Sequence, residues 1–433
     1  MKVCIMGMGY IGFPTACLLA NAGHHVVGVD VNTAIINSLH EGQLHIVNEE
    51  GLAALAQKVF SDGSLTVCDQ PSRADAFIIA VPTPFKHSND NIRERIFRPE
   101  ASYQADLGYV ISATRAIAPF VQPGNLVILE STVPPGTTEE VVVGTLREEG
   151  VDTSQLLVAH APERVLPGNL LAELVQNDRV IGGLTPAAGE AAAALYRSFV
   201  RGCISISDAK TAELVKLMEN TYRDVNIALA NEFALVCEHL KVNAWEAMSL
   251  ANRHPRVQFL RPGPGVGGHC IAVDPYFVVE AAPTLTDLIQ TARRINRRMP
   301  LHVVKLLHEL EGNQPVQRVA ILGASYKADV GDDRESPSLE IAQLLESEGI
   351  EVKVHDPFIA RYNLPLEDML RGAEALLLLT DHAVYASLDP NWVRELVSRP
   401  LLVDARGVVS LDDWCAAGFQ VKILGCGQQL VMV

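Results

Sequence analysis

The sequence predicts an α/β fold in which two Rossmann-like domains are joined by a long central helix. Three observations support this prediction. Short apolar strands alternate with helices over residues 1–200, an uninterrupted helical pattern follows, and a second strand–helix alternation begins near Arg318. Such alternation is typical of a mainly parallel sheet covered by helices. We therefore expect three parts, residues 1–200, 201–312 and 313–433, with the central part acting as a helical linker.

Composition and charge exclude several functional classes. Of the 433 residues, 48% are hydrophobic and 20% are charged, which is typical of a globular enzyme. The formal net charge of −16 argues against binding to nucleic acid or to an anionic membrane. No apolar run approaches the roughly 20 residues that a membrane helix needs, and Met1–Ile5 leads directly into the glycine pattern at Gly7–Gly12, so we expect no signal peptide. The eight cysteines are scattered, without a C-x-x-C pair or a metal-ligand cluster. We expect a cytoplasmic protein without a metal site.

The first strands enclose a glycine-rich turn. Lys2–Met6 reads as a buried strand, Gly7–Gly12 has the pattern G-x-G-x-x-G, Pro14–Ala22 reads as a helix, and His25–Val29 reads as a strand that ends on Asp30. This context is the one that a dinucleotide-binding fingerprint requires, because the N-terminus of the helix binds the pyrophosphate. The expected cofactor contacts are Gly7, Gly9, Tyr10, Ile11, Gly12 and Asp30.

Asp30 also predicts which dinucleotide is bound. A carboxylate at the end of the second strand accepts hydrogen bonds from the hydroxyls of the adenosine ribose and repels a 2′-phosphate. The next residues, Val31 and Asn32, supply no arginine that would hold such a phosphate. The sequence therefore favours NAD over NADP as the cofactor.

Further strands of the first part end in loops that carry polar residues. We expect these strands at Ala76–Val81, Leu126–Glu130 and Leu156–Ala159. Open α/β sheets bind ligands at the carboxyl ends of their strands, where this chain has Thr83, Thr132 and the pair Glu163 and Arg164. A surface ion pair is the alternative interpretation of Glu163 and Arg164.

The central part begins with one long helix, expected from Asp208 to His239. Glycine and proline are absent there, and apolar residues recur at intervals of three and four residues. Lys216, Asn220 and Arg223 share a face of this helix, so a cation, an amide and a guanidinium point the same way. A solvated polar face is the alternative. A second helix is expected at Leu285–Leu310.

The segment Pro262–Pro275 points most directly to chemistry. It has four glycines in six residues, then Cys270, with Asp274 four residues further on. Glycines let a backbone close around a ligand, and a cysteine there can act as a thiolate nucleophile while the carboxylate steers a base or a water. A tight turn with a structural cysteine is the alternative. Upstream, His254 and Arg256 form a cationic segment that suits a diphosphate, unless it is only an exposed basic turn.

The last part repeats the α/β pattern in a degenerate form. We expect a helix at residues 338–348 and strands at Arg318–Gly323, Glu351–Asp356, Ala375–Leu379, Leu401–Asp404 and Val421–Leu424. The turn Gly323–Lys327 lacks the G-x-G-x-x-G spacing, which indicates a ligand other than NAD. The charged loop that follows contains Arg334 and is expected to contact a nucleotide, although charged loops are usually only solvated.

In combination these motifs resemble the nucleotide-sugar 6-dehydrogenases of the UDP-glucose and GDP-mannose dehydrogenase superfamily. The resemblance rests on the N-terminal fingerprint, Ser131–Pro134, Lys216–Asn220, Gly267–Cys270 and Ser325–Lys327 with Arg334–Ser336. It implies an NAD-binding domain in residues 1–200, a dimerisation region in 201–312 and a UDP-sugar-binding domain in 313–433. It also implies a homodimer that serves the synthesis of surface polysaccharides in bacteria or archaea.

Within this superfamily the loops favour the branch that oxidises UDP-N-acetyl-D-mannosamine. Ala161–Gly168 departs from the N-P-E-F-L-x-E-G pattern usual in UDP-glucose dehydrogenases, whereas Asn252–Val257 and Gly265–Pro275 resemble the N-acetylmannosamine branch. The Phe-rich segment and the sequence Ile-Pro-Ile-Asp expected of a UDP-N-acetylglucosamine enzyme are absent. UDP-N-acetylglucosamine and UDP-glucose remain alternative substrates. N-acetylglucosamine is the C2 epimer of N-acetylmannosamine, so only the shape of the sugar pocket distinguishes the two.

The resemblance also implies roles for individual residues. The catalytic residues are expected to be Cys270, Lys216, Asn220, Asp274 and Glu163, in two oxidations at C6 that pass through a thiohemiacetal and a thioester on Cys270. Lys216, or a water held by Asp274, is the expected proton acceptor, and Glu163 positions the hydrolytic water. Thr83, Thr132 and Arg334 are expected to bind NAD with the fingerprint. The expected substrate contacts are Arg164, Val165, Lys216, Asn220, Arg223, His254, Arg256, Gly267, Tyr326, Lys327 and Arg406.

Two other functions remain open from the sequence. A dehydrogenase that stops at the aldehyde is one, but it would leave Cys270 without a role. A non-catalytic NAD-binding scaffold is the other, and it would need none of the residues Cys270, Lys216, Asn220 and Asp274.

Overall fold

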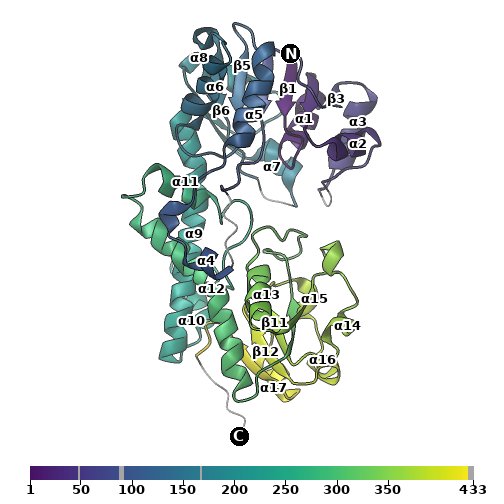
Figure 1. Cartoon of the computed structure of the whole chain (residues 1–433), viewed down its shortest axis with the longest axis vertical. Helices are drawn as coiled ribbons and strands as arrows, with labels where there is room; N and C mark the ends of the chain where they lie inside the picture. The colour runs from purple at the N-terminus through teal and green to yellow at the C-terminus, as the bar shows by residue number, and fades with distance from the viewer. Residues whose placement is uncertain (47–48, 87–91, 166–167, 428–433) are drawn as a thin grey trace. The chain divides into compact units, whose positions relative to one another are not determined.

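Helix α9 (Ala209–Leu240), 32 residues long, connects the two parts of the chain (Figure 1). The computed structural model describes residues 1–46, 49–86, 92–165 and 168–427. These fall into unit 1, with residues 1–86 and 103–219, and unit 2, with residues 87–102 and 220–433. Each unit contains one sheet with helices against it, so the predicted fold class, two Rossmann-like domains joined by a long helix, is confirmed.

Unit 1 contains a sheet of eight described strands in the order β3-β2-β1-β4-β5-β6-β7-β8. The first six follow the order typical of dinucleotide-binding folds, which reverses between β1 and β4. The strands are β1 (Lys2–Met6), β2 (His25–Val29), β3 (Leu65–Cys68), β4 (Ala76–Ile79), β5 (Leu126–Leu129), β6 (Leu157–His160), β7 (Arg179–Gly183) and β8 (Ile204–Asp208). The helices are α1 (Gly12–Asn21), α2 (Thr33–His40), α3 (Leu52–Ser61), α5 (Gly108–Ile117), α6 (Gly144–Glu148), α7 (Leu170–Gln176) and α8 (Pro186–Tyr196).

The central strands of this sheet are buried on both faces. Every residue of β4 and β5 is buried, and both strands are continuous apolar runs rather than alternating ones. Helices α1 and α5 pack against the sheet (Figure 1). This is the pattern that a parallel sheet with helices on its faces produces, and it explains why the predicted strands agree with the observed ones to within two residues.

Two strands, β7 and β8, depart from the parallel arrangement that the alternation indicated, since β8 pairs parallel with β7. β7 pairs antiparallel with β6, with Ala159 opposite Gly183 and His160 opposite Gly182. Among its described residues the connection contains one helix, α7, whose 7 residues rise about 10 Å, and the antiparallel pairing means that β7 begins at the edge where β6 ends. β7 therefore starts at the carboxyl edge, which places its first residue, Arg179, among the functional loops.

Unit 2 contains a parallel sheet in the order β10-β9-β11-β12-β13, which reverses between β9 and β11. Its strands are β9 (Arg318–Leu322), β10 (Glu351–His355), β11 (Ala375–Leu378), β12 (Leu401–Asp404) and β13 (Gln420–Ile423). Its helices are α4 (Ile92–Phe97), α10 (Ala244–Ala251), α11 (Asp274–Ala281), α12 (Asp287–Glu311), α13 (Pro337–Ser347), α14 (Leu366–Leu370), α15 (Ala383–Ala386), α16 (Pro390–Leu396) and α17 (Leu411–Ala416). Among the described residues, no helix is both long and apolar enough to cross a membrane.

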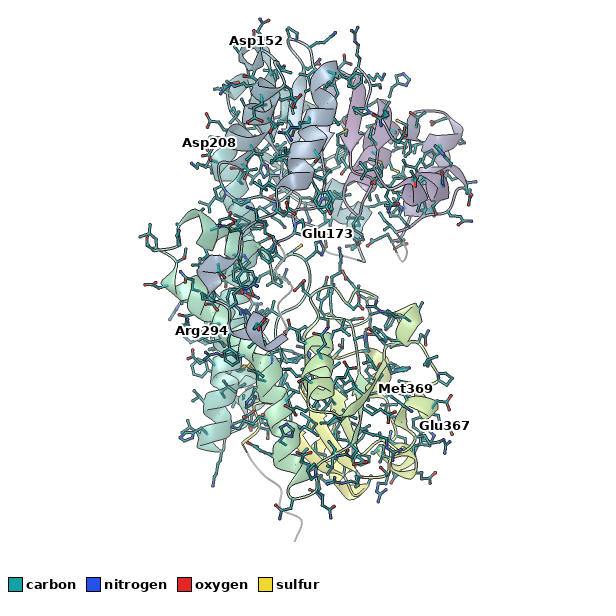
Figure 2. All side chains as sticks on the ribbon, in the orientation of Figure 1. Asp152, Glu173, Asp208, Arg294, Glu367 and Met369 are labelled. Carbon is teal, nitrogen blue, oxygen red and sulfur yellow. The ribbon has the colours of Figure 1, made fainter. Side chains whose placement is uncertain are left out.

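Local signals set the ends of α9. Asp208, labelled in Figure 2, accepts a hydrogen bond of 2.8 Å from the Thr211 amide and so caps the first turn. Lys241 follows the last helical residue with φ of 58°, the left-handed conformation in which many helices end. The predicted bounds, Asp208 to His239, are confirmed to within one residue.

Candidate active site

The turn after β1 fits the pyrophosphate of a dinucleotide. Gly7 has φ of 98°, and a Cβ there would collide with the Ala80 carbonyl oxygen. A Cβ on Gly12 would collide with the Gly7 carbonyl oxygen, whereas a Cβ on Gly9 would meet nothing within 4 Å. The turn is therefore closed towards the sheet and open on the side of Gly9. Ile11 gives α1 no side-chain cap, so no side chain competes with a phosphate for the first amides.

Asp30 is fixed beside this turn. Its Oδ2 accepts a hydrogen bond from the Met8 amide and its Oδ1 one from the Asn32 amide, each at 2.8 Å. Each carboxylate oxygen can accept a further bond, which suits the two hydroxyls of a ribose. The glycine turn and this carboxylate together fit NAD.

The loops after β4 and β5 are tied together at the same edge. The Thr83 hydroxyl donates to the Thr132 carbonyl oxygen over 2.6 Å. The Ser131 hydroxyl accepts from the Val81 amide at 2.9 Å and donates to the Val81 carbonyl oxygen at 2.7 Å. Because β4 neighbours β1, these loops flank the glycine turn at the point where the strand order reverses. Thr83 and Thr132 thus lie where contacts to NAD are predicted.

Glu163 lies in a buried ion pair rather than a surface one. Its Oε2 is 2.5 Å from Nη2 of Arg179, and only 4% of the Arg179 side chain is exposed. Its Oε1 accepts from the backbone amide of Arg164 at 2.7 Å. The alternative of a surface ion pair between Glu163 and Arg164 is therefore wrong. Arg179 was not predicted from the sequence, because its place at this edge depends on the antiparallel direction of β7.

Arg164 and Val165 point in different directions. Nη1 of Arg164 pairs with Glu219 of α9 over 2.5 Å, and its Nη2 donates to the Asp178 carbonyl oxygen. Val165 packs against the core of unit 1. In this structure the guanidinium is thus held by protein groups, and its selection of an acetamido sugar stays a prediction.

The polar face of α9 is only partly solvated. Lys216 and Asn220 are each 7% exposed, whereas Arg223 is exposed. The alternative of a solvated face is therefore wrong for the first two residues. The side-chain amide of Asn220 donates to Oδ2 of Asp274 over 2.6 Å. A residue of the long helix is thus bonded to the carboxylate that follows the predicted nucleophile.

Cys270 lies just before helix α11. Its carbonyl oxygen accepts from the Val273 amide at 3.0 Å and from the Asp274 amide at 2.8 Å, so Asp274 lies one turn further on. The Cys270 side chain is partly exposed. Cys270 therefore lies four residues before α11, with a side chain that a ligand in solution can reach.

Tyr326 packs against the glycines that precede Cys270. A Cβ on Gly267 would lie 2.6 Å from Cβ of Tyr326, and one on Gly268 would lie 2.9 Å from its ring. The Gly268 amide donates to the Arg334 carbonyl oxygen at 2.9 Å. Burial, and then the charges of Asp332 and Cys270, raise the pKa of Tyr326 to about 12, so its phenol is neutral at pH 7. Gly267, Tyr326 and Arg334 thus come together around the Cys270 loop.

A buried polar network, not predicted from the sequence, holds the start of this loop. The Gly263 amide donates to Oδ1 of Asn231 at 2.9 Å, and Nδ2 of Asn231 donates to Oδ1 of Asn296 at 2.9 Å. Nδ2 of Asn296 donates to Oδ1 of Asp224 at 2.8 Å, and Arg293 pairs with the same oxygen at 2.6 Å. The loop is therefore tied to α9 and α12. The only signal in the sequence is a polar residue within an apolar helical pattern.

Unit 2 has the same strand–turn–helix–strand arrangement as the fingerprint of unit 1, but the carboxylate after its second strand is not accessible to a ligand. Asp356 follows β10 as Asp30 follows β2, but it is fully buried. Its Oδ2 accepts from the amides of Ala324 and Ser325 at 2.9 and 2.8 Å and from Nε2 of His382 at 3.0 Å. Although burial raises the pKa of Asp356, the hydrogen bonds from His382 and Ser325 hold it well below its usual range. A ribose cannot reach this carboxylate, which agrees with the prediction of a ligand other than NAD.

The other predicted substrate contacts of unit 2 are more spread out. Arg406, two residues after β12, pairs with Asp381 at 3.1 Å, and its Nη1 would lie 2.5 Å from a Cβ on Gly263. Lys327 is exposed after β9. His254 and Arg256 are exposed after α10, where the Arg256 amide lies 3.4 Å from Nδ1 of His254. Arg406 thus approaches the glycine loop, and the described contacts of the other three do not involve it.

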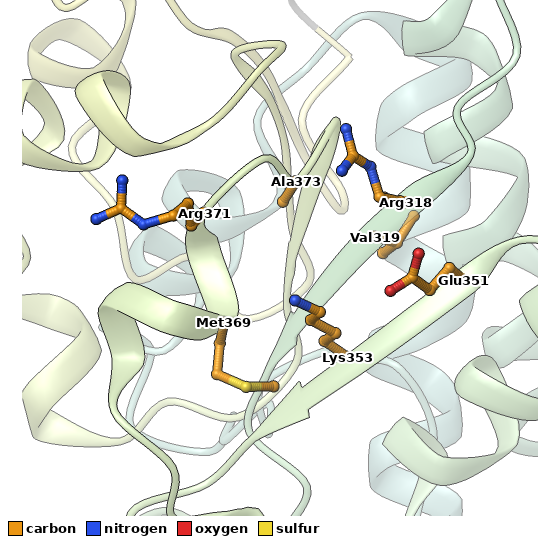
Figure 3. A pocket seen from close by; sticks show the side chains of 7 residues that line it. All are labelled: Arg318, Val319, Glu351, Lys353, Met369, Arg371 and Ala373. Carbon is orange, nitrogen blue, oxygen red and sulfur yellow. The ribbon is translucent and has the colours of Figure 1, made fainter.

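Two described pockets of unit 2 lie away from these residues. One, of about 10 Å³, is at the amino ends of β9 and β10, the edge opposite to the one where such sheets bind ligands (Figure 3). The second, of about 350 Å³, is lined by residues 96–101 with Gln290, Arg294 and Arg298 of α12. Neither includes a residue predicted for the site.

Three models of one protein family match successive parts of the chain. Residues 1–200 match the NAD binding domain of the UDP-glucose/GDP-mannose dehydrogenase family, residues 210–298 its central domain, and residues 320–411 its UDP binding domain. A UDP-N-acetyl-D-mannosamine dehydrogenase from Methanococcus maripaludis is 44% identical, with 98% of this chain and 97% of the relative covered. An NDP-N-acetyl-D-galactosaminuronic acid dehydrogenase from Ralstonia nicotianae is 42% identical, with 94% and 96% covered. The solved structure of a UDP-D-ManNAc dehydrogenase from Pyrococcus horikoshii superposes with a TM-score of 0.90 at 39% identity, with 99% of this chain and 100% of that chain covered.

Proposed function

Because the chain belongs to the UDP-glucose/GDP-mannose dehydrogenase family, we propose that it oxidises UDP-N-acetyl-D-mannosamine at C6 to the uronate. The chain is an NAD-dependent nucleotide-sugar dehydrogenase. The choice of sugar is supported by the relatives from Methanococcus and Pyrococcus, which carry that name. The observation that carries the proposed chemistry is the loop in which Cys270 precedes Asp274, with Asp274 bonded to Asn220.

Two molecules of NAD, bound one after the other, would supply the hydride acceptors for the two oxidations. In the first, the 6-hydroxyl gives its proton to Lys216 or to a water held by Asp274. The bond to Asn220 orients the Asp274 carboxylate, so a water on that carboxylate has a defined position. The product of this step is the C6 aldehyde.

Cys270 then takes part covalently. Its sulfur adds to the aldehyde carbon and forms a thiohemiacetal, which is a far better hydride donor than the free aldehyde. Loss of the second hydride and of the hydroxyl proton leaves a thioester on Cys270. Lys216 and Asn220 are the proposed donors to the oxyanion that develops at C6.

Water completes the reaction. It adds to the thioester carbon, the carbon–sulfur bond breaks, and the thiolate of Cys270 leaves together with a uronate and two protons. Glu163 is the proposed residue that orients this water and accepts its proton. Its pairing with Arg179 supports this role, because the ion pair at 2.5 Å holds the carboxylate in a defined position.

We also propose that two chains pair along α9 and that His254 and Arg256 complete the substrate site of the neighbouring chain. Large apolar side chains are exposed at Tyr222, Leu229, Phe233, Val236 and Leu240. Their spacing places them along one side of the helix, and such a stripe favours burial against a second copy. The uronate that the enzyme forms is an activated sugar, as the proposed role in surface polysaccharide synthesis requires.

The proposal is tested by measuring NAD reduction against UDP-N-acetylmannosamine, UDP-N-acetylglucosamine, UDP-N-acetylgalactosamine and UDP-glucose, with mass analysis of each product. The expected result is two NADH per sugar and a uronate, with the highest kcat/KM on UDP-N-acetylmannosamine. UDP-N-acetylgalactosamine belongs in the panel because of the name of the relative from Ralstonia. A higher kcat/KM on another sugar would replace the substrate but keep the reaction, whereas an aldehyde as the final product would contradict the covalent steps.

A further inference from the structure

Two carboxylates and one guanidinium are buried near one another at the carboxyl edge of unit 1. Glu130 directly follows β5, Glu163 lies three residues after β6, and Arg179 begins β7; all three side chains are buried. His160, at the end of β6, adds no second cation, because burial lowers the pKa of its imidazole to about 3. The remaining titratable group that faces Glu130 is the phenol of Tyr196 on α8.

The geometry assigns the guanidinium to Glu163. In the antiparallel pairing His160 lies opposite Gly182, so the same register, three residues after His160 and three residues before Gly182, brings Glu163 opposite Arg179. Their side chains meet at 2.5 Å. Glu130 instead accepts a hydrogen bond of 2.8 Å from the Tyr196 hydroxyl, and the ring of Tyr196 lies 4.8 Å beneath the Arg179 guanidinium. Oε2 of Glu130 and Nη1 of Arg179 have no partner among the described residues.

Glu130 therefore lacks the partner that a buried carboxylate needs. A buried charge persists only when it is paired, and a neutral phenol does not balance a carboxylate. Burial, followed by the negative charge of Glu163, raises the pKa of Glu130 to about 8, against smaller opposing effects of Arg179 and of the hydrogen bond from Tyr196. Burial and the charge of Glu130 raise the pKa of Tyr196 above its ordinary value as well, so the phenol keeps its proton. At pH 7 Glu130 is thus a neutral acid between Tyr196 and the ion pair.

We propose that Glu130 is a positioning residue for the hydrolysis of the thioester. As a neutral acid bonded to Tyr196, it fixes the tyrosine ring over which the Arg179 guanidinium lies. It does not compete with Glu163 for the charge of that guanidinium. Glu163, held in place by Arg179, can then take a proton from the attacking water as the carbon–sulfur bond breaks. When Glu130 loses its proton it competes for Arg179, and hydrolysis slows. This inference rests on the proposed function, because it acts through Glu163.

The protonation of Glu130 is tested without substrate by comparing the thermal midpoints of the wild type and Glu130→Gln from pH 5 to pH 9. A carboxyl group with a raised folded-state pKa stabilises the fold fully below its unfolded pKa and loses that contribution as the pH rises through the folded pKa, here about 8. Glutamine cannot titrate, so the midpoint of Glu130→Gln should rise relative to the wild type by at least about 2 °C between pH 5 and 9. A constant or falling difference would overturn the neutral state. Glu190→Gln, an exposed glutamate on α8, is the matched control and should show no such trend.

The positioning role is tested by the pH profile of kcat. At pH 7 Glu130→Gln should keep kcat to within about threefold, with KM unchanged, because glutamine resembles the neutral acid. The wild type should lose activity above about pH 8, and this alkaline limb should move up by about one pH unit or more in the variant. Tyr196→Phe removes the phenol but keeps the ring, and should lower kcat about fivefold at constant KM.

Each failure has a distinct meaning. A wild-type enzyme that oxidises no UDP-sugar would remove the proposed function and this role with it, while the thermal comparison would still report the charge of Glu130. If the wild type is active but Glu130→Gln loses kcat at the same alkaline pH as the wild type, the positioning role is overturned and the proposed function stands. A loss of kcat beyond tenfold in Glu130→Gln at pH 7 would also overturn it, because an ionised Glu130 would then be required.

Discussion

Asn220 donates a hydrogen bond of 2.6 Å from its side-chain amide to Asp274, and both side chains are buried. Asn220 belongs to α9, and Asp274 is the first residue of α11, four residues after Cys270. A charge-assisted bond between buried groups has a short, well-defined geometry. The long helix therefore orients the carboxylate next to the nucleophile, and changes in α9 are expected to affect the chemistry at Cys270.

The network behind the Cys270 loop gives a first prediction. Asn231→Leu removes the acceptor of the Gly263 amide and the donor to Asn296 at nearly constant volume. Buried groups left without a partner cost about 1–3 kcal/mol each, so the free energy of unfolding should fall by about 2–4 kcal/mol and kcat should fall with it. Denaturant unfolding and steady-state kinetics measure both. Asn226→Leu is the control, because the Asn226 side chain donates to the Tyr222 carbonyl oxygen of its own helix and, among the described residues, to no other element. Equal effects of the two substitutions would remove the special role of Asn231.

Asp30 gives a second prediction. Asp30→Ala removes the carboxylate expected to bind the adenosine ribose, and the loss of a charge-assisted hydrogen bond of about 1.5–3 kcal/mol corresponds to a ten- to hundredfold weaker affinity for NAD. Discrimination against NADP should decrease, because the charge that repels the 2′-phosphate is gone. Titration of both dinucleotides by fluorescence measures this. Asp62→Ala, at an exposed carboxylate, is the control. An unchanged affinity for NAD would show that Asp30 does not hold the ribose.

Arg164 gives a third prediction, which concerns the choice of sugar. Arg164→Leu should lower kcat/KM on UDP-N-acetylmannosamine about ten- to a hundredfold and affect UDP-glucose less, because UDP-glucose has no acetamido group. The structure adds a control, since the guanidinium pairs with Glu219 over 2.5 Å. Glu219→Gln removes that pair but keeps Arg164, and should not change the ratio of the two kcat/KM values. An equal loss on both sugars in Arg164→Leu would contradict a role in specificity.

The exposed stripe on α9 gives a fourth prediction. Tyr222 is 66% exposed on this helix, so Tyr222→Glu places a charge where the second copy is proposed to pack. The variant should be monomeric at concentrations at which the wild type is a dimer, as light scattering after size exclusion would show. Tyr109→Glu, at an exposed tyrosine on α5, should leave the oligomeric state unchanged. If the wild type is monomeric, or Tyr222→Glu remains a dimer, α9 is not the interface.

The parts of the site that depend on local pattern could be predicted from the sequence. The glycine turn, Asp30 and the Cys270 loop each lie within one short segment whose residue types specify both the backbone and the chemistry. The strands were predictable for a related reason, since runs such as Ala76–Ile79 are buried on both faces and contain no polar residue.

The parts that depend on tertiary register could not be predicted. The pairing of Glu163 with Arg179 requires an antiparallel β7, and the apolar run after Arg179 does not encode the direction of the strand. Tyr196 lies 66 residues from Glu130 and meets it only because α8 packs against the sheet. Asn231 and Asn296 likewise read as helical surface residues until α9 and α12 are placed together.

The central claim, that Cys270 carries the sugar between the two oxidations, is tested most directly by the products of Cys270→Ser. Mass analysis of the sugar, together with the number of NADH formed, should show two NADH and a uronate for the wild type. For Cys270→Ser no uronate should accumulate, because a serine adduct cannot form the thioester that water hydrolyses. Binding of NAD should be unchanged, which separates the loss from misfolding. Uronate formed by Cys270→Ser at the wild-type rate would contradict the covalent mechanism.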